Sequence, residues 1–261
     1  MRLDQRNQAF PGHDLIHLNQ ETLTAGLLTF ACVLGISERH LLHRGSTVQF
    51  VGQPYLTRFG SLFQSFPKAV TTEKRLKVGQ KLLFKLGGTT DVWVILCHWQ
   101  SLQTYSEGEY VRVEIALQLR GYVEDIYEQD PNALIIICGD FNDEPFSMPI
   151  QMTLKASRDI SYVKARSTAL FNPTWRLIGM NDLVTGRHLP AGTCSSSDAR
   201  HMTNWRTFDQ IILSSGFLRD EWSFVGSGVE IMSNIMVGGN PLSWKELSDH
   251  YPITCNLKRA V

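Results

Sequence analysis

The chain has 261 residues, of which 43% are hydrophobic and 19% charged, enough apolar material for one large α/β domain or two small ones. Its 25 basic residues balance its 25 acidic residues. This excludes a protein that is basic throughout, so any phosphate-binding surface must be local. Because no repeat, low-complexity tract or linker divides the sequence, we predict a single domain over residues 1–261.

The five cysteines are odd in number, scattered and without a Cys-x-x-Cys pair. Cys97, Cys138 and Cys255 stand inside apolar runs, which favours reduced, buried thiols and a reducing compartment. No stretch reaches the roughly 18 apolar residues of a membrane span, and the first 20 residues are too polar for a signal peptide. We therefore predict a cytoplasmic protein without a membrane span.

Strands are predicted from the N-terminal third onward. Alternating polar and apolar residues at 47–50 and 81–86 indicate half-buried strands. Short apolar runs rich in β-branched residues then indicate four buried strands, at 92–97, 133–138, 208–213 and 251–257.

An amphipathic helix is predicted between the first two buried strands, from about residue 109 to 128. Its apolar positions are Val113, Leu117, Leu119, Val123 and Ile126. Arg112 is assigned to the opposite, exposed face, and residues 130–132 are expected to end the helix. Strand, helix and strand form one α/β unit, and the whole pattern predicts a sandwich of sheets covered by helices.

Polar residues follow the buried strands at the positions where catalytic groups are commonly held. Asp140 and Asn142 come directly after the strand that ends at Cys138. A carboxylate there can handle a proton or a metal-bound water, and a neutral amide can donate to a phosphate oxygen. An ordinary turn, in which both side chains satisfy backbone donors, remains an equal alternative for this motif alone.

Three further strand ends carry candidate residues. Asp249 and His250 enter the last strand and offer a hard oxygen ligand beside a base that titrates near neutral pH. Asp209 opens an apolar run and would fix the imidazole of His250 if the two side chains bond. His98 ends the strand at 92–97 and would contact a phosphate or a leaving group. Taken singly, each has a structural alternative: a surface turn, a loop cap and a satisfied core histidine.

Together these motifs resemble the endonuclease/exonuclease/phosphatase family, which includes deoxyribonuclease and exonuclease III. The matching segments, in order, are His-Trp-x-Ser from His98, Gly-Asp-Phe-Asn-Asp-x-Pro from Gly139, Asp-Gln-Ile-Ile-Leu-Ser from Asp209 and Ser-Asp-His-Tyr-Pro-Ile from Ser248. The resemblance implies a four-layer α/β/β/α sandwich of two mixed sheets, like deoxyribonuclease I, with a pocket at one edge.

The resemblance also implies roles for the matching residues. Asp140 would orient or deprotonate the attacking water, and Asn142 would hold the phosphate. His250, held by Asp209, would act as a base or stabilise the pentavalent phosphate. His98 stands where deoxyribonucleases have a histidine, and Asp249 would help to bind Mg²⁺, with Mn²⁺ as an alternative.

The N-terminal part departs from the family pattern. The segment from Asp14 to Glu21 resembles the strand that ends in a metal-binding Glu, but Glu21 stands one position late, and a strand would need a bulge to restore its direction. Glu21 is still the predicted second metal ligand, with Glu38 as the alternative. Residues 1–11 do not read as a strand, so the usual first strand and its Asn are expected to be absent.

Three functions remain open from the sequence. A magnesium-dependent nuclease, acting on DNA rather than RNA, is the first, because the motifs are most similar to the deoxyribonuclease branch and lack the Arg residues typical of inositol-phosphate phosphatases. Six basic residues could line a groove, although a solvated edge explains them more simply: Lys68, Lys74, Arg75, Lys77, Lys81 and Lys85. Trp99, Trp175 and Trp205 could stack on bases or pack in the core. The other two functions are a small-molecule or lipid phosphodiesterase or phosphatase, and a binding domain that has lost its metal site.

Overall fold

The computed structural model describes residues 27–32, 47–48, 57–58, 68–71, 74–86, 90–106, 108–179, 190–195, 204–231, 235–237, 240–242 and 249–259. Glu21, Glu38 and residues 1–11 lie outside these ranges, so the predictions that concern them stay predictions.

Two sheets form the centre of the molecule. The main sheet has the strand order β6 (Gln80–Leu86), β7 (Thr90–His98), β8 (Leu134–Asp140), β13 (Asp209–Ser214), β10 (Leu170–Phe171) and β9 (Ala156–Ser157). It is mixed, because β7–β8 and β10–β9 pair in parallel and the other neighbours pair antiparallel. The second sheet is antiparallel and has the order β1 (Leu27–Cys32), β17 (Ile253–Arg259) and β14 (Trp222–Ile231).

Shorter elements complete the described chain. The helices are α4 (Tyr110–Gln129), α5 (Ile160–Lys164), a π-helical turn η2 (Pro149–Thr153) and the 3₁₀ turns η3 (Pro173–Leu177) and η4 (Ser215–Leu218). Four strand pairs lie apart from the sheets: β2 (Thr47–Val48) with β3 (Thr57–Arg58), β4 (Lys68–Thr71) with β5 (Lys74–Lys77), β11 (Cys194–Ser195) with β12 (Trp205–Arg206), and β15 (Ile235–Val237) with β16 (Asn240–Leu242).

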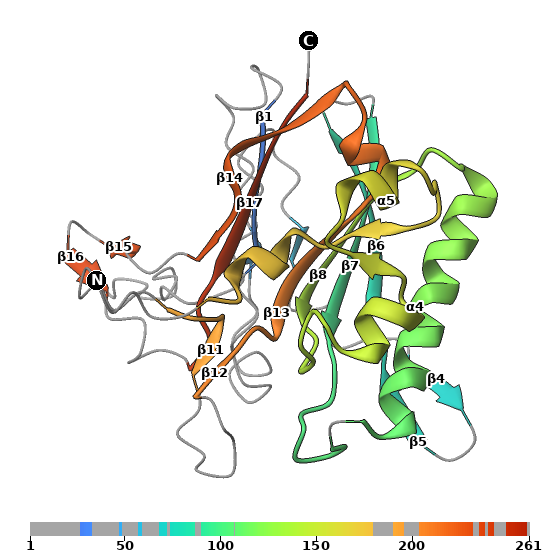
Figure 1. Ribbon diagram of the computed structural model, residues 1–261, viewed down its shortest axis with the longest axis vertical. Coiled ribbons are helices and arrows are strands. Elements are labelled where there is room, and N and C mark those ends of the chain that lie inside the picture. Colours follow the sequence, from blue (N-terminus) through green and yellow to red (C-terminus); the bar gives the residue numbers. More distant parts are fainter. Residues whose placement is uncertain are drawn as a thin grey trace, which may run out of the picture.

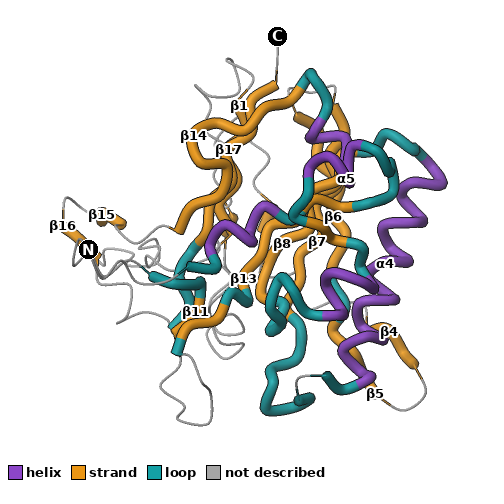
Figure 2. The backbone as a smooth tube through the Cα atoms, viewed as in Figure 1, coloured by secondary structure: helices purple, strands orange, loops and turns teal. Residues whose placement is uncertain are grey.

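The sheets stack face to face, with α4 on the outer face of the main sheet (Figure 1). Successive side chains of a strand point to opposite faces, so β7 contributes to two cores. Val94 and Leu96 join the core between the sheets, whereas Ile95 and Cys97 pack with the buried face of α4. The predicted α/β sandwich is confirmed, with a mixed main sheet and a second sheet whose described strands are all antiparallel. The described part of the chain contains three of the four predicted layers (Figure 2).

The predicted strands and helix are present, but two strands of the second sheet, β1 and β14, were missed. The run Leu27–Cys32 pairs along its full length with the last strand, from Leu27 opposite Lys258 to Cys32 opposite Ile253. Its six residues are too few and too uniformly apolar for periodicity to separate strand from helix, so the sequence carried only a weak signal.

The exposed face of α4 was assigned wrongly in part. Leu117, predicted to be buried, is 57% exposed, whereas Arg112, predicted to be exposed, is completely buried. The buried stripe runs through Ile115, Leu119 and Val123, and Arg112 lies on the same stripe one turn before Ile115. This arginine is buried because its guanidinium bonds to two loops, as described below.

Cys97, Cys138, Cys194 and Cys255 are free and buried, which confirms the prediction of reduced core thiols for Cys97, Cys138 and Cys255. Among the described residues, no helix combines the length and the apolar character needed to cross a membrane.

Candidate active site

Three of the predicted site residues lie side by side across adjacent strands of the main sheet. His98 is the register partner of Asp140, and Asp140 is the register partner of Asp209. Paired residues of neighbouring strands place their side chains on the same face. The end of β7, the end of β8 and the start of β13 therefore bring one imidazole and two carboxylates to one edge, where His98 Nε2 lies 3.9 Å from Asp140 Oδ2.

Unusual backbone angles at the end of β8 and in the turn after it explain why Gly and Asn occur there. Gly139 has φ 138°, a backbone conformation that side chains rarely allow, and Asn142 has φ 48°, a left-handed conformation that Asn tolerates better than most residues. Asn142 donates from its backbone N–H to Asp140 Oδ1 and from its amide Nδ2 to Asp140 Oδ2, both at 2.8 Å. The same Nδ2 donates to the carbonyl of Trp99 at 3.1 Å. Both amide hydrogens of Asn142 are thus given to the protein, which differs from the predicted phosphate contact.

The predicted bond between Asp209 and His250 is present. His250 Nδ1 lies 2.7 Å from Asp209 Oδ2, and both side chains are largely buried. Thr193 orients the pair, because its hydroxyl accepts from the backbone N–H of Asp209 at 3.0 Å and its carbonyl accepts from that of Tyr251 at 2.6 Å. A carboxylate bonded to one ring nitrogen fixes both the tautomer and the direction of the imidazole.

The two buried acids and the histidine perturb one another. Burial, followed by repulsion from Asp209, raises the pKa of Asp140 to about 7, although His250, Asn142 and Arg112 pull in the opposite direction. Burial alone would lower the pKa of His250, but the charge and hydrogen bond of Asp209 outweigh it and hold this pKa well above its ordinary value of 6.5. Near neutral pH, Asp140 therefore exchanges a proton readily while His250 carries one.

Arg112 is a residue of this site that the sequence analysis placed elsewhere. Its Nε donates to Asp143 Oδ2 at 2.6 Å, and its Nη2 donates to the carbonyls of Phe141 and Asn142 at 3.0 and 2.6 Å. Further bonds reach the carbonyls of Gln100 and Tyr105. A fully buried guanidinium thus ties the loop after β7 to the loop after β8. Its position on the stripe of Leu119 was the only signal in the sequence.

Gln210 and Asn172 extend this network. The side chain of Gln210 donates to the carbonyl of Asp143 and accepts from Asn172 Nδ2, both at 2.7 Å, and both side chains are fully buried. Neither was predicted as a site residue, because a Gln inside a strand and an Asn at the start of a turn carry no motif.

Asp249 stands at the entrance of the site. Asp249 is exposed and directly precedes His250, so its carboxylate can bind an ion from solvent. A hard carboxylate oxygen suits Mg²⁺, and in this respect the residue fits the predicted metal role. The second predicted ligand, Glu21, lies outside the described residues.

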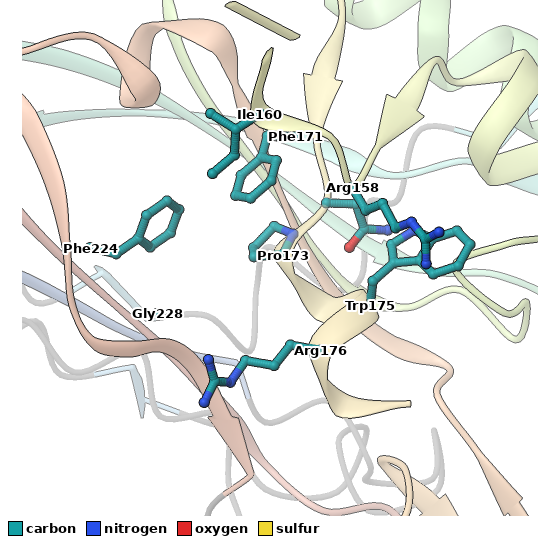
Figure 3. A pocket seen from close by; sticks show the side chains of 9 residues that line it. Arg158, Ile160, Phe171, Pro173, Trp175, Arg176, Phe224 and Gly228 are labelled. Atoms are coloured by element: carbon teal, nitrogen blue, oxygen red, sulfur yellow. The ribbon is translucent and has the colours of Figure 1, made fainter. Parts of the chain in front are cut away.

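A separate cavity of about 430 Å³ lies between η3, β10 and β14 (Figure 3). Phe171, Phe224 and Trp175 give it aromatic walls, while Arg158 lies over the ring of Trp175, 4.7 Å from its centroid. Arg176 extends across the opening toward the strand that carries Gly228. Asn172 lines this cavity and also bonds to Gln210, so a chain of hydrogen bonds joins the cavity to the loop of Asp143.

The other aromatic and basic residues considered for nucleic-acid binding differ in their positions. Trp99 is a core residue, fully buried with its Nε1 bonded to the carbonyl of Val78. Trp205 packs against Tyr251, the residue after His250, and their ring centroids are 5.8 Å apart. Lys81 pairs with Asp125 and covers the ring of Tyr122 on α4, as expected for a solvated edge.

An α/β sandwich with an Asp–His pair and a second buried carboxylate at one sheet edge has the form of a hydrolase. The chain belongs to the endonuclease/exonuclease/phosphatase family, because the profile of that family matches residues 60–240. Members of this family are phosphoesterase hydrolases that generally use divalent metal ions.

Several solved structures are similar to the chain. The human Nocturnin catalytic domain with bound sulfate is 18% identical, with 70% of this chain and 52% of that chain covered and a TM-score of 0.38. A humanized D. rerio TDP2 is 15% identical, with 94% and 98% covered and a TM-score of 0.45. A Bacteroides thetaiotaomicron mannosyl-6-phosphatase is 16% identical, with 64% and 51% covered and a TM-score of 0.33.

The chain spans about half the length of the Nocturnin domain and of two Bacteroides family proteins, at 52%, 52% and 55%. No curated protein matches the sequence.

Proposed function

We propose that this protein is a metal-dependent nuclease that hydrolyses phosphodiester bonds, with DNA as its first substrate class. The observation that carries the proposal is the row His98, Asp140 and Asp209 across three strands, completed by the bond from Asp209 to His250. In-line attack on a phosphodiester needs a group that takes a proton from water and groups that stabilise negative charge on the phosphoryl oxygens. This edge offers both.

The proposed roles follow from the charges. Asp140, whose pKa is raised to about 7, accepts the proton of the attacking water. His250 is protonated because of Asp209, so it stabilises the charged phosphate rather than acting as a base. The half-exposed His98 contacts the phosphate from the other side of Asp140. Asn142, whose amide is committed to Asp140 and Trp99, positions the acid instead of binding the substrate.

The proposed ion is Mg²⁺, with Mn²⁺ as the alternative, held by Asp249 and Glu21. When bound, it would supply Lewis-acid polarisation of a phosphoryl oxygen, typically worth several kcal/mol. Asp249 supports this assignment by its exposed position and its hard oxygen donors.

Nicking of a supercoiled plasmid tests the proposal. Purified protein is expected to nick the plasmid with Mg²⁺ and to stop when the ion is chelated. Asp140→Ala/His250→Ala is expected to lose this activity, because it removes the proton acceptor and the charge partner of the phosphate. Asp220→Ala, which changes an exposed acid away from the site, is the matched control and should keep wild-type rates. Nicking that survives in the double variant would place the chemistry elsewhere.

The cavity beside η3 favours a small phosphorylated compound as the second candidate substrate. Its volume, aromatic walls and two arginines suit an apolar body that carries an anionic group. If that candidate is right, Arg158→Ala/Arg176→Ala should raise KM for a small phosphate ester roughly 10–100-fold, since hydrogen bonds to charged groups contribute about 1.5–3 kcal/mol. Plasmid nicking by the same variant serves as the control. A KM that does not change would remove this candidate.

A further inference from the structure

Three side chains of different chemistry converge beside the Asp209–His250 pair. The thiol of Cys194, the carboxylate of Asp249 and the imidazole of His250 place one ligand atom each within 4.8 Å of one another. They offer one sulfur, one oxygen and one nitrogen. Cys194 belongs to none of the motifs that define the family resemblance, and the hydrolytic roles proposed above do not use it.

The backbone holds these residues in register. Cys194 lies in β11 and forms an isolated bridge with His250, while Ser195 donates to the carbonyl of Asp249 at 3.0 Å. On its other side Cys194 is the register partner of Arg206 in β12. The side chains of Cys194 and His250 also hydrogen-bond to each other. Strand pairing on both sides therefore fixes the thiol against the imidazole, and Asp249 closes the group from the solvent side.

We propose that Cys194, Asp249 and His250 form a binding site for a soft divalent cation, Zn²⁺. Thiolate and imidazole are ligands that Zn²⁺ prefers and Mg²⁺ avoids, and three protein ligands leave a fourth position open to water. Zinc–ligand bonds of about 2.0–2.3 Å bring the ligand atoms slightly closer together, which a small movement of the exposed Asp249 achieves. As the bonds to zinc form, the thiol of Cys194 and the Nε2 of the protonated His250 each give a proton to solvent.

The partner of His250 fits this role. Because Nδ1 bonds to Asp209 Oδ2 at 2.7 Å, coordination through Nε2 produces a carboxylate–histidine–zinc arrangement. Such outer carboxylates orient the ring and raise its basicity toward the metal, and their loss typically costs about 10–100-fold in affinity. Asp209 would thus support two states of the same imidazole, protonated and zinc-bound.

The site makes Zn²⁺ an inhibitor, an inference that rests on the proposed nuclease function. A bound zinc ion would take Asp249 away from Mg²⁺ and would occupy the imidazole that otherwise faces the phosphate. Micromolar zinc is therefore expected to stop Mg²⁺-dependent hydrolysis. Binding of zinc itself does not depend on whether the protein hydrolyses any substrate.

Metal binding is measured on the full chain without substrate. Metal-free wild-type protein titrated with Co²⁺ should develop the charge-transfer absorption of a thiolate–cobalt bond, and Zn²⁺ should abolish it at one equivalent. Cys194→Ser should lose the absorption and bind zinc more weakly by more than the roughly 10–100-fold expected for Asp209→Asn. Asp249→Asn, at an exposed position that folding tolerates, should weaken zinc binding without removing the thiolate band.

Cys138→Ala is the matched control, since this thiol is buried in the core between the sheets. It should leave both the cobalt absorption and the zinc affinity at wild-type values. The proposal is overturned if wild-type protein shows no thiolate band, or if folded Cys194→Ser keeps its zinc affinity.

Activity separates this inference from the proposed function. Zinc binding that depends on Cys194 in a protein without hydrolytic activity would remove the nuclease proposal and leave the zinc site standing. Activity that zinc inhibits in the wild type but not in Cys194→Ser would support both. Activity that zinc inhibits equally in the two proteins would show that the inhibitory ion binds elsewhere.

Discussion

Arg112→Met is expected to lower the free energy of unfolding by about 3–5 kcal/mol, the cost of breaking a buried ion pair from one side. The arginine is fully buried and bonds to Asp143, and its loss removes the positive charge beside that carboxylate, which is only 3% exposed. The carbonyls of Phe141 and Asn142 lose their donors as well. Urea unfolding followed by circular dichroism measures the change.

Arg120→Met is the matched control on the same helix. Arg120 is also buried, but its carboxylate partner Glu124 is half exposed, so water can solvate that acid after the substitution. We expect a loss of about 1 kcal/mol, near the net contribution of an ordinary hydrogen bond. If Arg112→Met costs no more than Arg120→Met, Arg112 does not hold the two loops together.

A second comparison separates the ion pair from the other bonds of Arg112. Arg112→Met/Asp143→Leu removes both charges, so no uncompensated carboxylate stays buried. Its stability is expected to recover in part, because the carbonyls that Arg112 served still lack donors. Equal destabilisation of the single and double variants would mean that Asp143 contributes little to the effect.

The strands and the site edge could be predicted because their signals are local. Runs such as 133–138 are apolar and β-branched, and a strand that ends in Gly-Asp must deliver Asp140 to the edge of its sheet. The order of the motifs then indicated which ends would meet. The register of His98, Asp140 and Asp209 across three strands agrees with that order.

The residues that were missed depend on contacts between distant segments. Arg112 is buried because it bonds to a loop about 30 positions later in the chain, and no helical pattern contains that loop. Gln210 and Cys194 look ordinary in sequence and gain their surroundings only when β13 and β11 reach the site. Composition likewise does not show that Asp140 and Trp99 accept the amide hydrogens of Asn142.

Asp140→Asn is expected to lower kcat by roughly 10²–10⁴-fold, the usual contribution of a general base. An amide of the same shape cannot accept the proton of water. In the wild type, kcat should rise with pH through about 7, where Asp140 loses its proton. A pH–rate profile of both proteins on one substrate measures the effect. If Asp140→Asn keeps the rise near pH 7, another group is the base.

The same substitution should change the stability profile in a defined direction. Folding raises the pKa of Asp140 from 3.8 to about 7, so its contribution to stability is full below about pH 4 and is lost as pH rises through 7. Asp140→Asn has no group that titrates here, so this loss does not occur in the variant. The free energy of unfolding of the variant, minus that of the wild type, should therefore be larger at pH 8 than at pH 5. The lost bond from Asn142 costs about 1 kcal/mol at both pH values and cancels in the comparison.

His250→Asn tests the contribution of the histidine to the pH dependence of stability. The pKa of His250 is raised above its ordinary 6.5, so its contribution is full below pH 6.5 and declines only as pH rises beyond that value. The variant should keep the wild-type slope well below pH 6.5, where Asp140 dominates. It should depart from the wild type above pH 6.5, also because the loss of His250 removes a charge that lowers the pKa of Asp140. If the variant departs from the wild-type curve only below pH 6.5, His250 does not carry the proton assigned to it, and its role must be abandoned.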